Sequence, residues 1–172
     1  METTLHAALW VAIVLQGTAL IALRRRLLEV RHLLQTIDVP QQRRLAAGTR
    51  APAFDTTLRP SGRRVTHHTL LGRLATLLFL SPACGVCAML IDNLRSAPHD
   101  DRLTLLWSGD EDRAPAVGPF DVAVENVNHI AALYGVDAFP TAVVIDANGF
   151  VLKYAHPTNY QELAGLLLRE TA

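Results

Sequence analysis

The stretch LATLLFLSPACGVCAML, residues 74–90, decides the fold, because it joins an apolar run to a cysteine pair and a helical pattern. The run at 74–80 predicts a fully buried, central strand. Cys84 and Cys87, the only two cysteines of the chain, follow directly, and residues 87–97 predict a helix. The sequence therefore places the first thiol at the N-terminus of a helix.

The position of the two thiols favours a dithiol switch. Unpaired N–H groups and the helix dipole stabilise a thiolate at Cys84, and Cys87, one turn further, can attack a disulfide formed there. A structural disulfide closing so short a loop would remove little entropy, and a zinc site needs about two more ligands. His67 and His68 could be considered as the two further zinc ligands, but adjacent residues on a strand point to opposite faces of the sheet. We expect no metal and no cofactor.

From Ala51 onward, short apolar runs alternate with amphipathic stretches, which predicts an α/β domain. The predicted elements are two short strands around the turn at 60–62, a second buried strand at 102–108, a loop at 109–121, a short helix at 127–136, a hairpin at 141–154 turning at Asn148-Gly149, and a closing helix at 159–170.

Pro140 lies between the predicted short helix and the hairpin. A proline is allowed at the very start of a strand, where no ladder N–H is needed, and a proline at such a corner is a candidate for a cis bond. An ordinary trans proline at the end of a loop is the alternative. Three further histidines stand alone and are predicted to be structural or exposed, namely His99, His129 and His156.

FLSPACGVC, followed 56 positions after Cys84 by Pro140 in GVDAFPTAVVIDANGFVLKY, resembles the thioredoxin-like superfamily. Within it, three features are most similar to the methylamine utilisation accessory proteins, MauD. They are an apolar N-terminal stretch that predicts a membrane anchor, the SPxCxxC form and the ending HPTNYQELAGLLL. The resemblance implies a thioredoxin-like α/β fold, a central mixed sheet flanked by helices, in which Cys84 attacks, Cys87 resolves, and Pro140 with the Phe139 backbone docks the partner chain. It implies a membrane-tethered oxidoreductase that forms, reduces or isomerises disulfides in a client, as in maturation of a periplasmic amine dehydrogenase.

Two positions depart from the superfamily pattern. Gly85 stands where relatives usually have a proline, and Leu77 and Leu78 stand where many thioredoxins have a buried acid, so Cys87 has no obvious proton acceptor. Two other functions stay open. One is a peroxiredoxin-like peroxide reductase, although SPACGVC matches its Thr/Pro-rich, arginine-backed loop poorly; the other is a non-catalytic assembly module for a membrane partner.

An apolar stretch precedes this domain. Residues 5–23, LHAALWVAIVLQGTALIAL, carry no formal charge apart from His6, and at about 1.5 Å per residue they nearly match a hydrocarbon core of about 30 Å. We expect a transmembrane anchor within 1–23, a juxtamembrane helix and linker at 24–50, and the domain at 51–172. A signal-peptide core and a buried helix are the alternatives, but a basic n-region and a cleavage site are missing.

Charge limits the partners. Sixteen Lys and Arg balance sixteen Asp and Glu, which gives no case for nucleic acid. We expect a client protein with cysteines and an integral-membrane redox partner. Four arginines after the apolar stretch would place the domain in the cytoplasm by the positive-inside rule. Disulfide chemistry belongs in an oxidising compartment, so we expect a single-pass membrane protein with an extracytoplasmic domain.

Overall fold

The computed structural model describes Trp10, Gln16, Gly17 and residues 44–168. Residues 44–168 belong to a unit that runs from Gln42 to Ala172. Most of the predicted anchor and of the juxtamembrane segment lies outside the described residues. Among the residues that the structure describes, no helix has the length and apolar character needed to cross a membrane.

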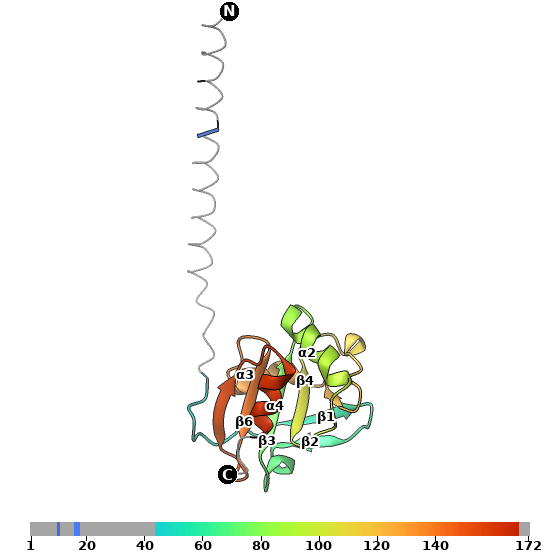
Figure 1. The fold of residues 1–172 in the computed structure, drawn as a ribbon. Helices are drawn as coiled ribbons and strands as arrows, with labels where there is room; N and C mark the ends of the chain where they lie inside the picture. The colour runs from blue at the N-terminus through green and yellow to red at the C-terminus, as the bar shows by residue number, and fades with distance from the viewer. Residues whose placement is uncertain (1–9, 11–15, 18–43, 169–172) are drawn as a thin grey trace, which may run out of the picture. The chain divides into compact units, whose positions relative to one another are not determined.

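A seven-stranded mixed sheet forms the centre of the domain, with the strand order β2-β1-β5-β4-β3-β6-β7 (Figure 1). The central strand β3 runs parallel to β4 and antiparallel to β6. The strands are β1 (Asp55–Arg59), β2 (Arg64–Thr66), β3 (Ala75–Leu80), β4 (Leu103–Trp107), β5 (Val122–Ala123), β6 (Thr141–Ile145) and β7 (Val151–Ala155). Every residue of β3 is buried, which confirms the predicted central strand.

Helices cover both faces of the sheet (Figure 1). Leu78 and Leu80 of β3 pack with α2 (Gly85–Arg95) and α4 (Tyr160–Leu168), and Leu77 and Phe79 pack with α3 (Val127–Leu133) on the other face. These four β3 side chains are fully buried. Because successive side chains of a strand point to opposite faces, one apolar run supplies both cores.

Two features of the secondary structure differ from the prediction. Strand β5 was not expected, because two residues are too few to show an alternating pattern; the strand is defined by its neighbours β4 and β1. Helix α2 begins at Gly85, two residues before the predicted start at residue 87. The hairpin of β6 and β7 is confirmed, and Gly149 takes the positive φ of 85° that its turn needs.

The histidine pair differs more. His67 and His68 lie on the 3₁₀ helix η1 (His67–Leu70) and not on a strand, and their ring centroids are 3.8 Å apart. The prediction that they face opposite ways was therefore wrong. The cause is local: the Thr69 hydroxyl accepts from the Thr66 N–H at 3.2 Å and donates to the Thr66 carbonyl at 2.7 Å, which closes the chain into a turn.

Candidate functional site

We call residues 81–87 the thiol segment. It follows β3 directly, and Cys84 is the N-cap of α2 with extended backbone angles. The Cys84 Sγ accepts a hydrogen bond from the Cys87 backbone N–H at 3.1 Å, as a capping side chain does. Both thiols are free in the structure. The predicted placement of Cys84 at the start of a helix is confirmed.

The two thiols differ in exposure. Cys84 is half-buried, whereas Cys87 is fully buried in an apolar cluster that includes Leu78, Leu80 and Ile91. Burial, together with the contact to the Cys84 sulfur, raises the pKa of Cys87 to about 12. A buried thiol resists losing its proton because the thiolate would lose its hydration. At neutral pH Cys87 therefore keeps its proton while Cys84 faces solvent.

The surroundings of Cys87 contain no buried acid. Leu77 and Leu78 are both fully buried, at the positions where the sequence predicted that an acid would be missing. Over residues 44–168, no Asp or Glu side chain is buried. A proton leaving Cys87 must therefore pass to the Cys84 side of the site or to solvent.

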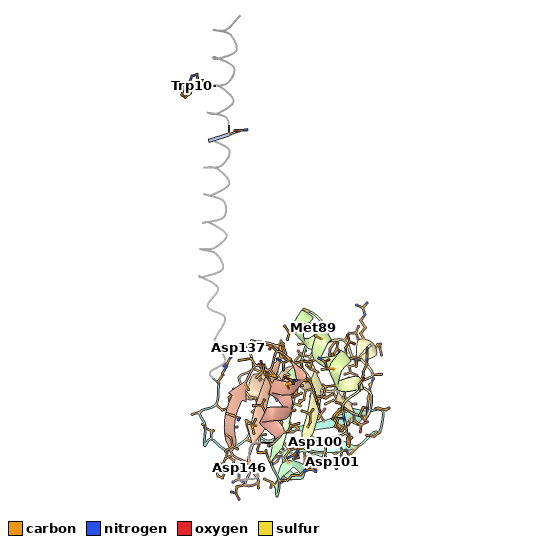
Figure 2. The ribbon with its side chains drawn as sticks, in the orientation of Figure 1. Trp10, Met89, Asp100, Asp101, Asp137 and Asp146 are labelled. Atoms are coloured by element: carbon orange, nitrogen blue, oxygen red, sulfur yellow. The ribbon has the colours of Figure 1, made fainter. Side chains whose placement is uncertain are left out.

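We call residues 138–141 the proline segment. The Phe139-Pro140 peptide bond is cis, as predicted, and so is Arg59-Pro60 in the first hairpin. The Cys84 thiol donates to the Phe139 carbonyl oxygen at 3.3 Å, so the two segments meet. Met89 follows the thiol segment closely in sequence, and Asp137 directly precedes the proline segment. Figure 2 shows these two residues toward one end of the domain and Asp100, Asp101 and Asp146 toward the other end.

Three successive carbonyl oxygens of the proline segment each contact a side chain. The pairs are Thr141 Oγ1 with Ala138 O at 2.6 Å, Cys84 Sγ with Phe139 O at 3.3 Å, and His156 Nδ1 with Pro140 O at 3.0 Å. His156 Nδ1 also lies 3.2 Å from Thr141 Oγ1. The sequence predicted only that His156 would be structural or exposed, and the structure has it exposed. The contact of His156 with the proline segment follows from the register of the hairpin. Ala142 pairs with Ala155, so His156 lies opposite Thr141.

The loop after β4 supports the thiol segment from beside it. A Cβ added at Gly109 would lie 2.8 Å from the Trp107 Nε1 and 2.9 Å from two ring carbons of Pro82. The Trp107 indole in turn donates to the Asp110 carbonyl at 3.3 Å. Pro82 itself, with Ala83 and Gly85, is exposed to solvent. The loop after β4 thus lies close to Pro82, while three residues of the thiol segment are exposed.

The other histidines lie elsewhere. His67, His68 and His129 line a cavity of about 540 Å³ together with apolar side chains that include Phe54 and Ile130. The His67 Nδ1 is buried without a hydrogen-bond partner. His99 contacts Asp101 at 2.9 Å. Over the described part of the chain, no group of three or more His, Cys, Asp or Glu side chains is arranged to hold a metal ion.

Comparison of the sequence with known proteins finds no match: no family model matches the chain, and no curated protein matches it. Solved structures do match. A candidate protein disulfide isomerase of Bacteroides thetaiotaomicron is 25% identical, with 72% of this chain and 86% of that chain covered and a TM-score of 0.55. A candidate thiol:disulfide interchange protein DsbE of Chlorobium tepidum is 23% identical, covering 72% and 96%, with a TM-score of 0.54.

A third match is the thioredoxin domain of a thiol-disulfide oxidoreductase from Bacteroides vulgatus, 19% identical over 70% of this chain and 97% of that chain, with a TM-score of 0.53. The three matches cover between 70% and 72% of this chain and between 86% and 97% of the matched chains. Together with the mixed sheet and the meeting of Cys84 with the Phe139 carbonyl, they show that this chain has the thioredoxin-like α/β fold.

Proposed function

We propose that this protein is a thiol–disulfide oxidoreductase. The observation that carries the proposal is the pairing of a half-exposed N-cap thiol, Cys84, with a fully buried thiol, Cys87, one helical turn away. The names of the structural neighbours, which describe proteins of disulfide exchange, support it. A pair with one accessible and one protected sulfur suits sequential attack and resolution.

The reaction has two exchange steps. The Cys84 thiolate attacks one sulfur of a client disulfide, which forms a mixed disulfide and releases the other client sulfur as a thiolate. Cys87 then loses its proton and attacks the Cys84 sulfur, which forms the Cys84–Cys87 disulfide and releases the second client thiolate. Two electrons pass from the dithiol to the client. The reverse sequence oxidises a client dithiol, so the partner that renews the pair sets the direction.

The burial of Cys87 shapes the second step. With a pKa of about 12, the resolving thiol is almost wholly protonated at neutral pH. In the mixed disulfide the contact with the Cys84 thiol is gone, but burial, the largest cause of the raised pKa of Cys87, remains, so the mixed disulfide should persist until Cys87 loses its proton. This delay gives the client time to exchange other sulfurs, which favours rearrangement of client disulfides as well as net transfer.

The proline segment offers a docking edge for the client. The Phe139 carbonyl, which the Cys84 thiol contacts in the free protein, becomes available when Cys84 bonds to a client sulfur. An extended client backbone beside Phe139 and Pro140 would then pair with main-chain groups and tolerate varied sequences. For a peroxide reductase, we would expect an arginine at the reactive sulfur. Within the described residues, no arginine forms a hydrogen bond with Cys84.

The setting of the domain is part of the proposal. We propose that residues 5–23 anchor it in a membrane as a single pass, with the domain outside the cytoplasm and an integral-membrane redox partner that renews the thiols. The apolar composition of that stretch supports the anchor. The resemblance to MauD supports a client of the amine dehydrogenase kind.

The test is redox equilibration of the full chain followed by turnover. In mixtures of reduced and oxidised glutathione, Cys84 and Cys87 should form a reversible disulfide, seen by mass spectrometry as the loss of two hydrogens. The chain should then catalyse exchange on a scrambled model protein, and Cys84→Ser should reduce the rate to background. Oxidation to a sulfinic acid without disulfide formation, or turnover of hydrogen peroxide faster than of disulfides, would contradict the proposal.

A further inference from the structure

We propose that His156 is a positioning residue that holds the proline segment in place for the client while the Cys84 sulfur changes its bonding. The inference rests on the proposed function, because it concerns the docking edge of that site. Its basis is a hydrogen bond that no sequence motif indicates, between the His156 Nδ1 and the Pro140 carbonyl oxygen at 3.0 Å.

The partners of His156 fix which ring nitrogen carries the proton. The Pro140 carbonyl can only accept. The Thr141 hydroxyl gives its one proton to the Ala138 carbonyl at 2.6 Å, so at 3.2 Å from the His156 Nδ1 it too can only accept. The Nδ1 therefore carries a hydrogen and donates to both oxygens. This donor is present in the neutral and in the protonated ring, so the contact survives protonation of His156.

The contact matters because the third anchor of the segment is temporary. In the reduced protein the Cys84 thiol donates to the Phe139 carbonyl. A thiolate has no proton to give, and neither has a sulfur in a disulfide, so this bond is lost at each step of the proposed reaction. The remaining side-chain anchors are then Thr141 on the Ala138 carbonyl and His156 on the Pro140 carbonyl.

The position of His156 allows it to act without taking part in the chemistry. It is the residue after β7 and lies opposite Thr141 in the hairpin, while its contact with the segment is through the ring and not through the main chain. The residue is exposed overall, although the contact with Pro140 is partly buried. Pro140 is buried and has no N–H of its own to offer. Removing the ring donor should therefore loosen the docking edge more than the fold.

Two probes with the same leaving group separate docking from sulfur chemistry. One is a short extended peptide whose single cysteine carries a thionitrobenzoate group, and the other is 2-mercaptoethanol carrying the same group. His156→Leu removes the donor and keeps an apolar side chain of similar length. His156→Asn keeps a donor, because the asparagine side-chain N–H₂ reaches nearly the same place as the Nδ1.

In single turnovers of the reduced full chain, which need no added reductant, His156→Leu should raise the KM for the peptide probe, the concentration at half-maximal rate, at least about tenfold, with the limiting rate kcat within about threefold of the natural chain. Its rate with the mercaptoethanol probe should stay within about twofold, because that probe has no backbone to dock. His156→Asn should restore the peptide KM to within about threefold. Equal slowing with both probes, an unchanged KM in His156→Leu, or no rescue by His156→Asn would overturn the inference.

A measurement on the unaltered protein guards against a variant that fails to fold. Two-bond ¹⁵N–¹H correlation of the histidine rings should show His156 with its hydrogen on Nδ1. A hydrogen on Nε2 alone would overturn the inference without any variant. If the natural chain reacts with neither probe while His156 shows the Nδ1–H form, the proposed function fails and the hydrogen bond stands.

Discussion

The thiol segment and the proline segment meet at one hydrogen bond but are built in different ways. In the thiol segment, the Cys84 sulfur caps the helix by accepting a hydrogen bond from the backbone N–H of Cys87, three residues further along the same turn. In the proline segment, three carbonyl oxygens depend on side chains, one of them from Cys84 and one from His156, sixteen positions beyond Pro140. The first is a local structure, and the second exists only in the folded domain.

This difference indicates where each property of the site is decided. Reactivity depends on the helix start, which a strand followed by C-x-x-C and a helix already implies, and on the burial of Cys87 in the packed domain. Docking depends on the proline segment, which the hairpin of β6 and β7 brings to Cys84. Substitutions should therefore affect the two properties separately.

The largest expected effect concerns the reactivity of Cys87. Because burial raises the pKa of Cys87 to about 12, its thiolate is far scarcer at pH 7.5 than that of a free thiol with a pKa of about 8.5. The Cys84→Ala variant removes the contact with Cys84 but keeps burial, the largest cause of the raised pKa of Cys87, so alkylation by iodoacetamide should be at least about a hundredfold slower in the native state than in urea. The matched Cys87→Ala variant, in which Cys84 is half-exposed, should show much weaker protection. Comparable protection in the two variants would remove the distinction between the thiols.

The second effect is the pH dependence of resolution. Because the pKa of Cys87 is raised, its thiolate is scarce below pH 12 and increases about tenfold for each pH unit. A mixed disulfide of Cys84 with thionitrobenzoate should therefore resolve about a hundredfold faster at pH 9 than at pH 7. Stopped-flow absorbance follows the released thionitrobenzoate, and Cys87→Ser should show no intramolecular resolution. A rate that stays flat over this pH range would mean that another group takes the proton from Cys87.

The third effect compares the two ends of α2. Gly118 has a φ of +54°, and a Cβ there would lie 2.4 Å from the Arg95 carbonyl oxygen at the end of the helix, whereas Gly85 at its start has open space. Gly118→Ala should lower the free energy of unfolding by at least about 2 kcal/mol, and Gly85→Ala should change it by less than about 0.5 kcal/mol. Urea unfolding measures both. Similar losses in both variants would show that the reactive end is as tightly packed as the far end.

The smallest effect compares two buried threonines on neighbouring strands. The Thr141 hydroxyl serves the proline segment, but the Thr76 hydroxyl is buried without a partner. Thr141→Val should cost about 1–2 kcal/mol of unfolding free energy because it leaves the Ala138 carbonyl without its donor. Thr76→Val removes an unsatisfied hydroxyl and should be neutral or stabilising by up to about 1 kcal/mol. Shifts of the urea midpoint in the same direction and of similar size for both variants would contradict the role given to Thr141.

The sequence predicted the local half of the site better than the distant half. The apolar run, the helix start at Cys84 and the proline at a strand entrance are patterns of neighbouring residues, and the structure confirms their placement. The sequence predicted His156 only as structural or exposed, because a single histidine carries no periodic signal, and its contact with Pro140 depends on the register of the hairpin. His67 and His68 were misread because a threonine hydroxyl turned an expected strand into a 3₁₀ helix.

The length of an element limited the prediction too. Strand β5 has two residues and is set by pairing with β4 and β1, so its own sequence could not reveal it. The catalytic roles of Cys84 and Cys87 and the docking role of Phe139 and Pro140 stay predictions until they are measured. The structure supplies the distances that make them testable.

The most direct test is to trap the mixed disulfide. The full chain with Cys87→Ser or Cys84→Ser is mixed with the peptide that carries thionitrobenzoate, and intact mass spectrometry follows the covalent adduct. Since Cys84 is half-exposed, while burial covers Cys87 and is the largest cause of its raised pKa, Cys87→Ser should form one stable adduct at Cys84, and Cys84→Ser should form almost none. Adduct formation in Cys84→Ser at a rate equal to that in Cys87→Ser would contradict the assignment of Cys84 as the attacking thiol.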